Sequence, residues 1–197
     1  MHLWLGTLRQ WHWISSALCL VGMLLFAVTG ITLNHAAQIE ASPQVIERQA
    51  RLPEALQREL QAQPPEAGMP EPLRTWLESE LEIDLTERDA EWTDGELYVA
   101  LPRAGGDAWL SLELESGELL YEFTDRGWIS YLNDLHKGRN TGVAWNWFID
   151  IFAGACVVFS LTGLLLLQRH AAGRPTTWPL VGLGLVVPVL LALLFIH

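Results

Sequence analysis

The apolar run ISSALCLVGMLLFAVTGITL, residues 14–33, decides the fold class of this protein. It contains no charged side chain, and with Trp11 and Trp13 ahead of it the segment reaches the ~20 residues that a helix needs to cross a bilayer. Residues 145–167 and 178–196 have the same character, and both of these runs begin with tryptophan, whose amphipathic ring settles at the headgroup level. The sequence therefore predicts a membrane α-helical protein with three transmembrane helices.

The charged residues are concentrated between the first and second of these runs. Of the 23 acidic and 12 basic residues, 22 and nine respectively lie between Glu40 and Arg139, so this stretch has a net charge of −13. A polar block between apolar blocks is typical of a membrane protein with one extramembrane domain. A domain this negative repels nucleic acid and anionic lipid, so neither is an expected partner of the domain. Membrane lipid is the expected partner of the three apolar helices.

The short segments beside the helices predict the orientation. Arg9 precedes the first helix, and Arg169 and Arg174 lie in the connector 168–177. By the positive-inside rule both segments face the cytoplasm, so the N-terminus is cytoplasmic and the acidic domain is periplasmic, at a bacterial inner membrane. The first helix is expected to stay uncleaved, because its apolar run is longer than that of a signal peptide.

Inside the acidic domain a helical pattern is followed by a strand pattern. Leucines recur at every fourth residue in two stretches, as they do on one face of a helix: Leu52, Leu56 and Leu60, then Leu73, Leu77 and Leu81. Residues 96–101, 109–114 and 118–123 alternate in polarity between glycine-containing turns, which is typical of β-hairpins. We therefore expect a small α+β domain with an antiparallel meander packed by helices.

A further amphipathic stretch, 127–137, lies directly before the second apolar run. Trp128, Leu132 and Leu135 share a helical stripe there, which predicts a short helix along the membrane interface. The chain then divides into five segments: 1–36 with the first transmembrane helix, the acidic domain 37–126, the juxtamembrane helix and loop 127–144, the second transmembrane helix 145–170, and the turn with the third helix 171–197.

The six histidines avoid the acidic domain, since none lies between Ala36 and Leu135. With the orientation above, four of them form two candidate pairs, His12 with His170 at the inner face and His35 with His136 at the outer face. Two facing imidazoles on neighbouring helices are how membrane cytochromes hold haem b. Two such haems would give electrons a way across the membrane. The alternative for each histidine is an ordinary polar role at the interface.

The first helix cannot present both of its histidines to one neighbour. His12 and His35 are 23 residues apart, which leaves them ~140° apart on an ideal helix segment ~34 Å long. Either the outer end of the helix unwinds, or another helix, which a second subunit could contribute, supplies the partner. Small residues predict close helix packing, or room for a cofactor against the backbone, at Gly22, Gly30 and Gly163.

Several other kinds of chemistry are excluded by the sequence. The two cysteines, Cys19 and Cys156, lie in apolar runs and are expected to be packing residues, so the domain has neither a disulfide framework nor a thiol-ligated metal. The chain has no H-E-x-x-H, no G-x-S-x-G, no phosphate-binding loop and no nucleotide-cofactor fingerprint. No internal repeat extends over the whole chain.

Three stretches resemble the PepSY-associated transmembrane proteins. RQWHW (9–13) leading to TGITLNH (29–35) is similar to the first helix of that family. LHKG (135–138), followed by an apolar run that ends in SLTGLLL (160–166), is similar to its next helix. LELESGELL (112–120) is similar to the strand-turn-strand of a PepSY domain. The resemblance covers about residues 8–170 and leaves the third helix outside it.

The resemblance implies a cofactor and a set of ligands. Larger members of the family are haem b proteins of the inner membrane, several of them linked to iron uptake, that reduce ferric siderophores. By resemblance, His12, His35, His136 and His170 would ligate haem iron, with one or two haems b per chain. This chain has one PepSY-like unit and three helices, so a complete site could require a homodimer or a membrane partner subunit.

The expected function is therefore transport of electrons across the inner membrane by haem b, with a ferric siderophore as the periplasmic acceptor, which would make the protein a reductase. One alternative is a haem-free, membrane-anchored PepSY-like domain that binds or regulates a periplasmic protein. Another is an accessory subunit of a larger redox complex. A cytochrome would be red when purified, whereas a binding module would be colourless.

Overall fold

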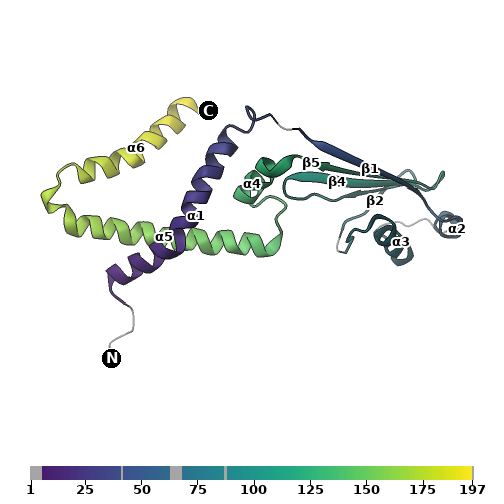
Figure 1. Ribbon diagram of the computed structural model, residues 1–197, viewed down its shortest axis with the longest axis horizontal. Coiled ribbons are helices and arrows are strands. Elements are labelled where there is room, and N and C mark those ends of the chain that lie inside the picture. Colours follow the sequence, from purple (N-terminus) through teal and green to yellow (C-terminus); the bar gives the residue numbers. More distant parts are fainter. Residues whose placement is uncertain (1–5, 41, 63–67, 87, 197) are drawn as a thin grey trace. The chain divides into compact units, whose positions relative to one another are not determined.

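A computed structural model of the chain describes residues 6–40, 42–62, 68–86 and 88–196 (Figure 1). Three of its helices are long and apolar enough to cross a membrane: α1 (Leu8–Asn34), α5 (Gly142–His170) and α6 (Thr177–Phe195). They confirm the three transmembrane helices expected from the sequence. Most of their large apolar side chains are exposed, as lipid-facing side chains are, and a 3-10 turn (Ala171–Gly173) lies between α5 and α6.

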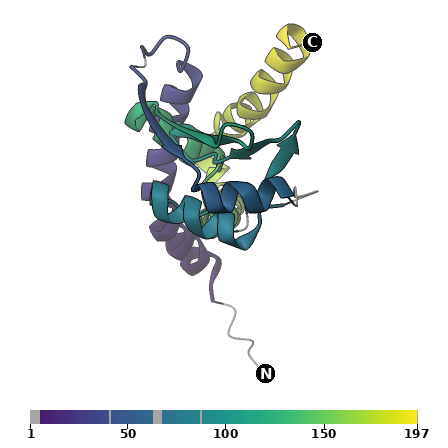
Figure 2. The same ribbon diagram turned by 90° about the vertical axis from the view of Figure 1, so that its right-hand side faces the viewer.

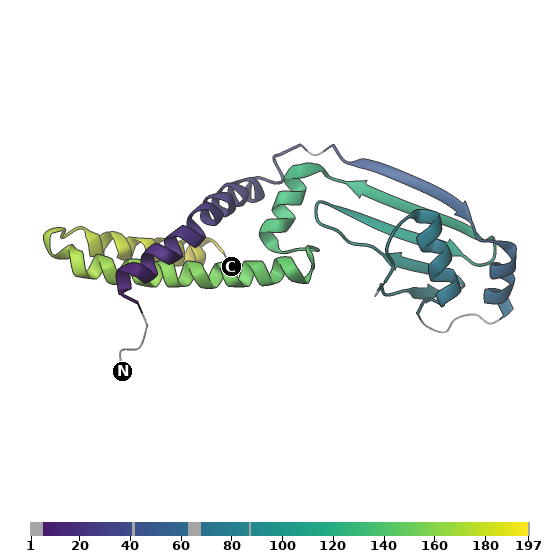
Figure 3. The ribbon, with the colours of Figure 1, turned by 60° about the horizontal axis from the view of Figure 1, so that its bottom comes forward.

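The segment between α1 and α5 folds as an α+β domain, as expected. Its elements are β1 (Gln44–Arg51), α2 (Glu54–Ala62), α3 (Glu71–Leu81), β2 (Glu91–Thr93), β3 (Glu96–Ala100), β4 (Gly106–Glu113), β5 (Glu118–Asp125) and α4 (Gly127–Lys137). The strands form one antiparallel sheet in the order β1-β5-β4-β3-β2 (Figure 3). The meander of the three predicted hairpin strands is therefore confirmed, with an additional strand at each edge.

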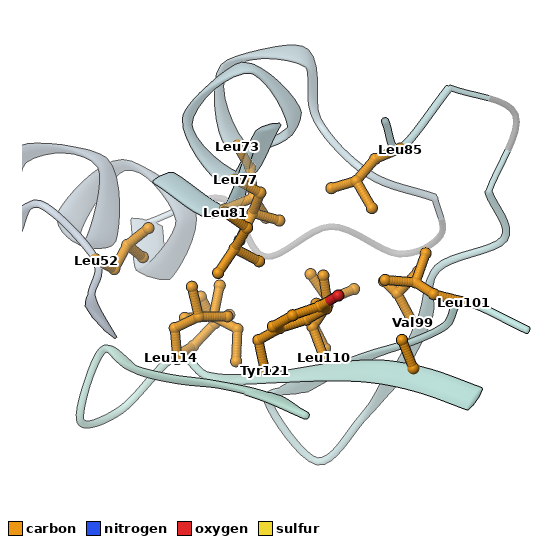
Figure 4. Close-up of a cluster of buried hydrophobic side chains, with 14 of the residues drawn as sticks. Leu52, Leu73, Leu77, Leu81, Leu85, Val99, Leu101, Leu110, Leu114 and Tyr121 are labelled. Carbon is orange, nitrogen blue, oxygen red and sulfur yellow. The ribbon is translucent and has the colours of Figure 1, made fainter. Parts of the chain in front are cut away.

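The domain core lies between one face of the sheet and the helices α2 and α3 (Figure 2). Every second residue of β4 is buried, which follows from the alternation of side chains across a strand. Figure 4 shows Leu73, Leu77 and Leu81 of α3 pointing toward Leu110 and Tyr121 of the sheet. The fourfold leucine spacing of residues 73–81 is thus the buried face of α3, as predicted.

Two strands differ from the sequence prediction. The edge strand β1 has no buried residue, and no apolar alternation distinguishes it. Its position comes from pairing with β5, in a register that sets Gln44 opposite Asp125. The leucine repeat predicted a helix from Leu52, but Leu52 lies between β1 and α2, and the helix begins at Glu54. At the other edge, β2 has only three residues.

The chain divides into two compact units, Met1–Leu25 with Trp147–His197, and Phe26–Asn146, and the boundary falls within α1 and α5. In the first unit α1 and α5 pack closely. A Cβ added to Gly22 would come within 2.3 Å of the Phe152 ring, so glycine is what permits this approach. Cys19 is buried and donates to the carbonyl oxygen of Ser15, and both Cys19 and Cys156 are free thiols.

Candidate functional site

His12 lies against α5, where three residues surround its imidazole. Nδ1 is 3.0 Å from the hydroxyl oxygen of Thr162, and the ring stacks on Phe159 with 4.9 Å between centroids and 12° between planes. A Cβ added to Gly163 would lie 3.2 Å from Cε1 of His12. Glycine at position 163 therefore leaves room for the imidazole beside the α5 backbone.

The threonine hydroxyl has acceptors on its own helix as well as His12 beside it. The Thr162 hydroxyl has a single hydrogen, and its oxygen lies 2.7 Å from the carbonyl oxygen of Val158 and 3.0 Å from that of Phe159. When that hydrogen is donated to one of these carbonyls, the hydroxyl oxygen is left to accept from Nδ1 of His12. In this arrangement a neutral His12 has its proton on Nδ1 and a lone pair on Nε2.

His170 lies near His12, at the end of α5. Its Nδ1 is 2.8 Å from the carbonyl oxygen of Leu166, and because a carbonyl only accepts, Nδ1 is again the protonated nitrogen. The two histidines line one open groove of about 340 Å³. The other residues that line it are Gly163, Leu166, Leu167, Ala171, Arg174 and Thr177. The inner pair proposed from the sequence thus opens on a shared space.

His136, in the second unit, has surroundings of the same kind. It lies at the end of α4, with Nδ1 2.7 Å from the hydroxyl oxygen of Thr29 in α1 and its ring centroid 5.0 Å from that of Phe26. A Cβ added to Gly30 would lie 3.5 Å from Cε1 of His136. The Thr29 hydroxyl also lies 3.2 Å from the carbonyl oxygen of Phe26, and when it donates there its oxygen is left to accept from the imidazole, as for Thr162.

His35 follows the end of α1 and is exposed. Its Nδ1 is 3.0 Å from the carbonyl oxygen of Ile31, and because a carbonyl only accepts, Nδ1 is the protonated nitrogen, as in His170. His35 and His136 are therefore each anchored to the last turns of α1, at Ile31 and Thr29 respectively. Within the described part of the chain, no hydrogen bond occupies Nε2 of any of the four histidines.

Polar contacts hold α4, the helix that ends at His136. The Asp134 carboxylate is 1% exposed and accepts hydrogen bonds from the Gly105 N–H at 2.9 Å and from Arg139 at 2.8 Å. Burial raises the pKa of Asp134, but the Arg139 guanidinium and the Gly105 N–H outweigh it and hold the pKa below the ordinary value. The hydroxyl of Thr32 lies 2.9 Å from the Asn133 side-chain oxygen, which ties α4 to α1 as well.

The buried face of α4 is therefore polar, which the sequence did not predict. The apolar stripe of Trp128, Leu132 and Leu135 has Trp128 69% exposed and both leucines half-buried, and its placement along the membrane interface stays a prediction. Asn133 and Asp134 are the buried residues of this helix. Its helical structure is as predicted.

The four histidines have a donor set that fits haem. An iron held between two axial imidazoles takes two protein nitrogens, and Nε2 is available on each of these side chains. Glycine beside the imidazoles of His12 and His136 lets each ring lie against the backbone of the neighbouring helix. No group of three or more His, Cys, Asp and Glu side chains gathers as for a bare metal ion within residues 6–40, 42–62, 68–86 and 88–196.

Sequence reasoning found the histidines but not the threonines and phenylalanines that hold two of them. The Thr-Gly pairs at 29–30 and 162–163 belong to the stretches that resemble the PepSY-associated proteins, and Phe26 shares a helix stripe with Gly22 and Gly30, but none of these signals predicts a contact with a histidine. The signal that could have found them is a short repeat, Phe-x-x-Thr-Gly, which occurs at residues 26–30 and again at 159–163.

The fold and these sites define a class of protein: three membrane helices, an antiparallel α+β domain inserted after the first, and histidines at the helix ends. The chain belongs to the family described as Putative PepSY_TM-like, whose model matches residues 3–197. The PepSY-associated family suggested by the motifs is thereby confirmed, and the match includes α6. No curated protein and no solved structure matches the chain.

Proposed function

We propose that the protein is a haem b protein of the bacterial inner membrane that carries electrons across it. The observation on which this rests is the groove shared by His12 and His170, where Nδ1 of each imidazole has an oxygen partner and no hydrogen bond among the described residues occupies Nε2. An imidazole whose Nδ1–H is already bonded to oxygen is the form in which histidine ligates a metal through Nε2.

Each residue of the groove has a distinct part in this proposal. His12 and His170 would hold the iron, and the groove wall at Gly163 would receive the ring. Arg174, the permanently charged residue of the lining, would face the propionate carboxylates. When bound, haem supplies reversible one-electron chemistry, and these residues bind it, orient it and set its electronics.

His136 and His35 would form a second site toward the other end of α1. Thr29, which holds His136, is 17 residues beyond His12 in α1, equivalent to about 26 Å of helix. Two haems at these levels would connect the two faces of the membrane. Arg9, Arg169 and Arg174 favour the cytoplasm for the His12 end and hence the periplasm for the acidic domain.

The acceptor in this proposal is ferric iron bound by a siderophore, as the resemblance to the larger PepSY-associated proteins implies. His35 is exposed, so a homodimer partner or another membrane subunit could contribute to the binding site of the second haem. Ferric-siderophore reduction is then tested after haem, with the reduced protein mixed with a ferric siderophore and its reoxidation followed by absorbance.

The first experiment is a visible spectrum of detergent-purified protein, oxidised and dithionite-reduced, with a pyridine haemochrome count per chain. A b-type band is expected, and His12→Ala and His170→Ala should each remove the haem of the groove. Gln168→Ala, on the exposed side of the same helix, is the control and should keep the full count. Colourless wild-type protein, after expression with ample haem, would overturn the proposal.

A second candidate is a haem-free, anchored domain that binds a periplasmic protein, and the open face of the sheet favours it. This face, opposite α2 and α3, has Tyr98 stacked on Trp109 at 6.2 Å, and Trp109 donates to Glu122. Exposed aromatic rings among carboxylates are suited to contact with another protein. Under this alternative the protein is colourless, and Trp109→Ala, rather than His12→Ala, abolishes binding of the periplasmic partner protein.

A further inference from the structure

The pentapeptide Phe-x-x-Thr-Gly occurs twice in the membrane helices, with an offset of 133 residues. One copy is Phe26, Thr29 and Gly30 in α1, and the other is Phe159, Thr162 and Gly163 in α5. Residues spaced by three and four positions lie on one face of a helix. Each copy therefore presents a ring, a hydroxyl and an open patch of backbone side by side.

Each copy receives a histidine from a different helix, and the three positions make contacts of the same kind in both, although the two rings are stacked at 12° for His12 and tilted at 44° for His136. The phenylalanine ring lies about 5 Å from the imidazole, at 4.9 Å for His12 and 5.0 Å for His136. The threonine oxygen faces Nδ1 at 3.0 Å and 2.7 Å respectively. The glycine faces Cε1 in both. We call this arrangement the histidine seat.

The threonine is the part of the seat that acts on the chemistry of the imidazole. Because its own hydrogen is directed to a backbone carbonyl of its helix, it offers Nδ1 an acceptor and no donor. That fixes the proton on Nδ1 and makes Nε2 a better electron donor. In apolar surroundings an Nδ1–H without this acceptor is unsatisfied, so the tautomer protonated on Nδ1 is no longer favoured.

We infer that Thr29 and Thr162 are positioning residues of two equivalent histidine seats, which hold His136 and His12 in the tautomer that ligates haem iron through Nε2. This inference rests on the proposed function for the identity of the bound group, but the choice of tautomer is a property of the chain alone. The seats are used in pairs with His35 and His170, whose Nδ1 protons are held by backbone carbonyls instead.

A threonine-to-valine change tests the inference because valine keeps the shape of the side chain and removes the acceptor. In Thr162→Val we expect haem in the groove to be retained about 10- to 100-fold more weakly, the usual effect of losing such a partner of a metal-ligating histidine. The haem that remains should titrate at a higher midpoint potential, because a less electron-rich imidazole stabilises ferric iron less. Thr162→Ser keeps the hydroxyl and should restore both properties.

Ser160→Ala is the matched control, since it removes a hydroxyl from the exposed side of α5 two residues away. Thr29→Val should change the midpoint potential of the haem held by His136 and leave the midpoint potential of the haem in the groove unchanged. Equal potentials and equal haem retention in Thr162→Val and Ser160→Ala would overturn the inference, while leaving the haem itself, and hence the proposed function, in place.

A second measurement works without haem. Nitrogen-15 NMR of haem-free protein labelled at histidine, with His12 assigned by a His12→Gln variant, distinguishes the two neutral tautomers. We expect wild-type His12 to be protonated on Nδ1, and Thr162→Val to populate the Nε2 tautomer. An unchanged tautomer in Thr162→Val would overturn the inference, whereas a colourless wild-type protein would overturn only the proposed function.

Discussion

Replacing Asp134 with alanine should loosen the contact between α4 and the β3–β4 connection without unfolding the domain. The Asp134 carboxylate accepts a hydrogen bond from the buried N–H of Gly105 at 2.9 Å and pairs with Arg139 at 2.8 Å. Lys137 is more distant, at 3.7 Å. Alanine would leave the Gly105 N–H without an acceptor in a position from which water is excluded.

The magnitude follows from which partners can turn to water. A hydrogen bond to a buried charged group contributes about 1.5–3 kcal/mol, and the Gly105 N–H would lose its bond entirely. Arg139 is 51% exposed and Lys137 is 41% exposed, so both recover hydration and add at most about 1 kcal/mol. We therefore expect the free energy of local opening to fall by about 2–3 kcal/mol. The equilibrium constant for opening then rises roughly 30- to 140-fold.

Hydrogen exchange measured by mass spectrometry on the full chain in nanodiscs reports this opening directly. Peptides from residues 103–109 and 127–137 should exchange faster by that factor in Asp134→Ala. The matched control is Asp107→Ala, whose partner is Arg126 in a pair with side chains 49% and 39% exposed, and which should change exchange less than about fivefold. Equal exchange in the two variants would refute the assignment of Asp134 as a structural anchor.

The same carboxylate predicts a response to acid. The folded-state pKa of Asp134 is lowered from the ordinary value of 3.8, so its stabilisation is complete above that value and is lost as the pH falls through the lower folded pKa. After correction for intrinsic rates, protection of residues 127–137 should decline only below about pH 3.8. Asp134→Asn, which has no charge to titrate, should lack this step.

Three further changes give direct tests of packing. Gly22→Leu should lower the thermal stability of the detergent-solubilised protein by about 1–3 kcal/mol, because even a Cβ would meet the Phe152 ring at 2.3 Å, whereas Gly154→Leu, where a Cβ meets nothing within 4 Å, should not. Leu110→Ala should lower the urea midpoint of the domain by the equivalent of about 2–5 kcal/mol, since Leu110 is fully buried. Gly105→Ala should raise exchange in the β3–β4 connection, because its φ is +78° and a Cβ would lie 2.8 Å from that of Tyr131; unchanged exchange would contradict this contact.

The elements that the sequence predicted are those whose signal is local. A run of 20 apolar residues identifies a membrane helix by itself, and the alternation in residues 109–114 identifies a strand that is buried on one face. Strand β1 has no comparable signal. It is an edge strand that faces solvent, and its neighbour β5 lies some 70 residues further along the chain, so only tertiary pairing defines it.

The site shows the same division. His12, His35, His136 and His170 could be singled out as candidates because no histidine lies in the acidic stretch between Ala36 and Leu135 and the expected topology pairs these four. Their hydrogen-bond partners could not be, because Thr162 lies 150 residues from His12, and Thr29 lies 107 residues from His136. A threonine in an apolar helix is in itself unremarkable, and its part in the site depends on which imidazole the fold brings to it.

The polar face of α4 determines where His136 lies along α1. An apolar stripe would allow the helix to slide or rotate against its neighbours at small cost, since such contacts have no fixed direction. Asn133, Asp134 and His136 instead make directional bonds to Thr32, Gly105 and Thr29, on α1 at two points and on the β3–β4 connection at one. Three such bonds within one turn determine the position of α4 along α1, and with it the height at which Nε2 of His136 is offered.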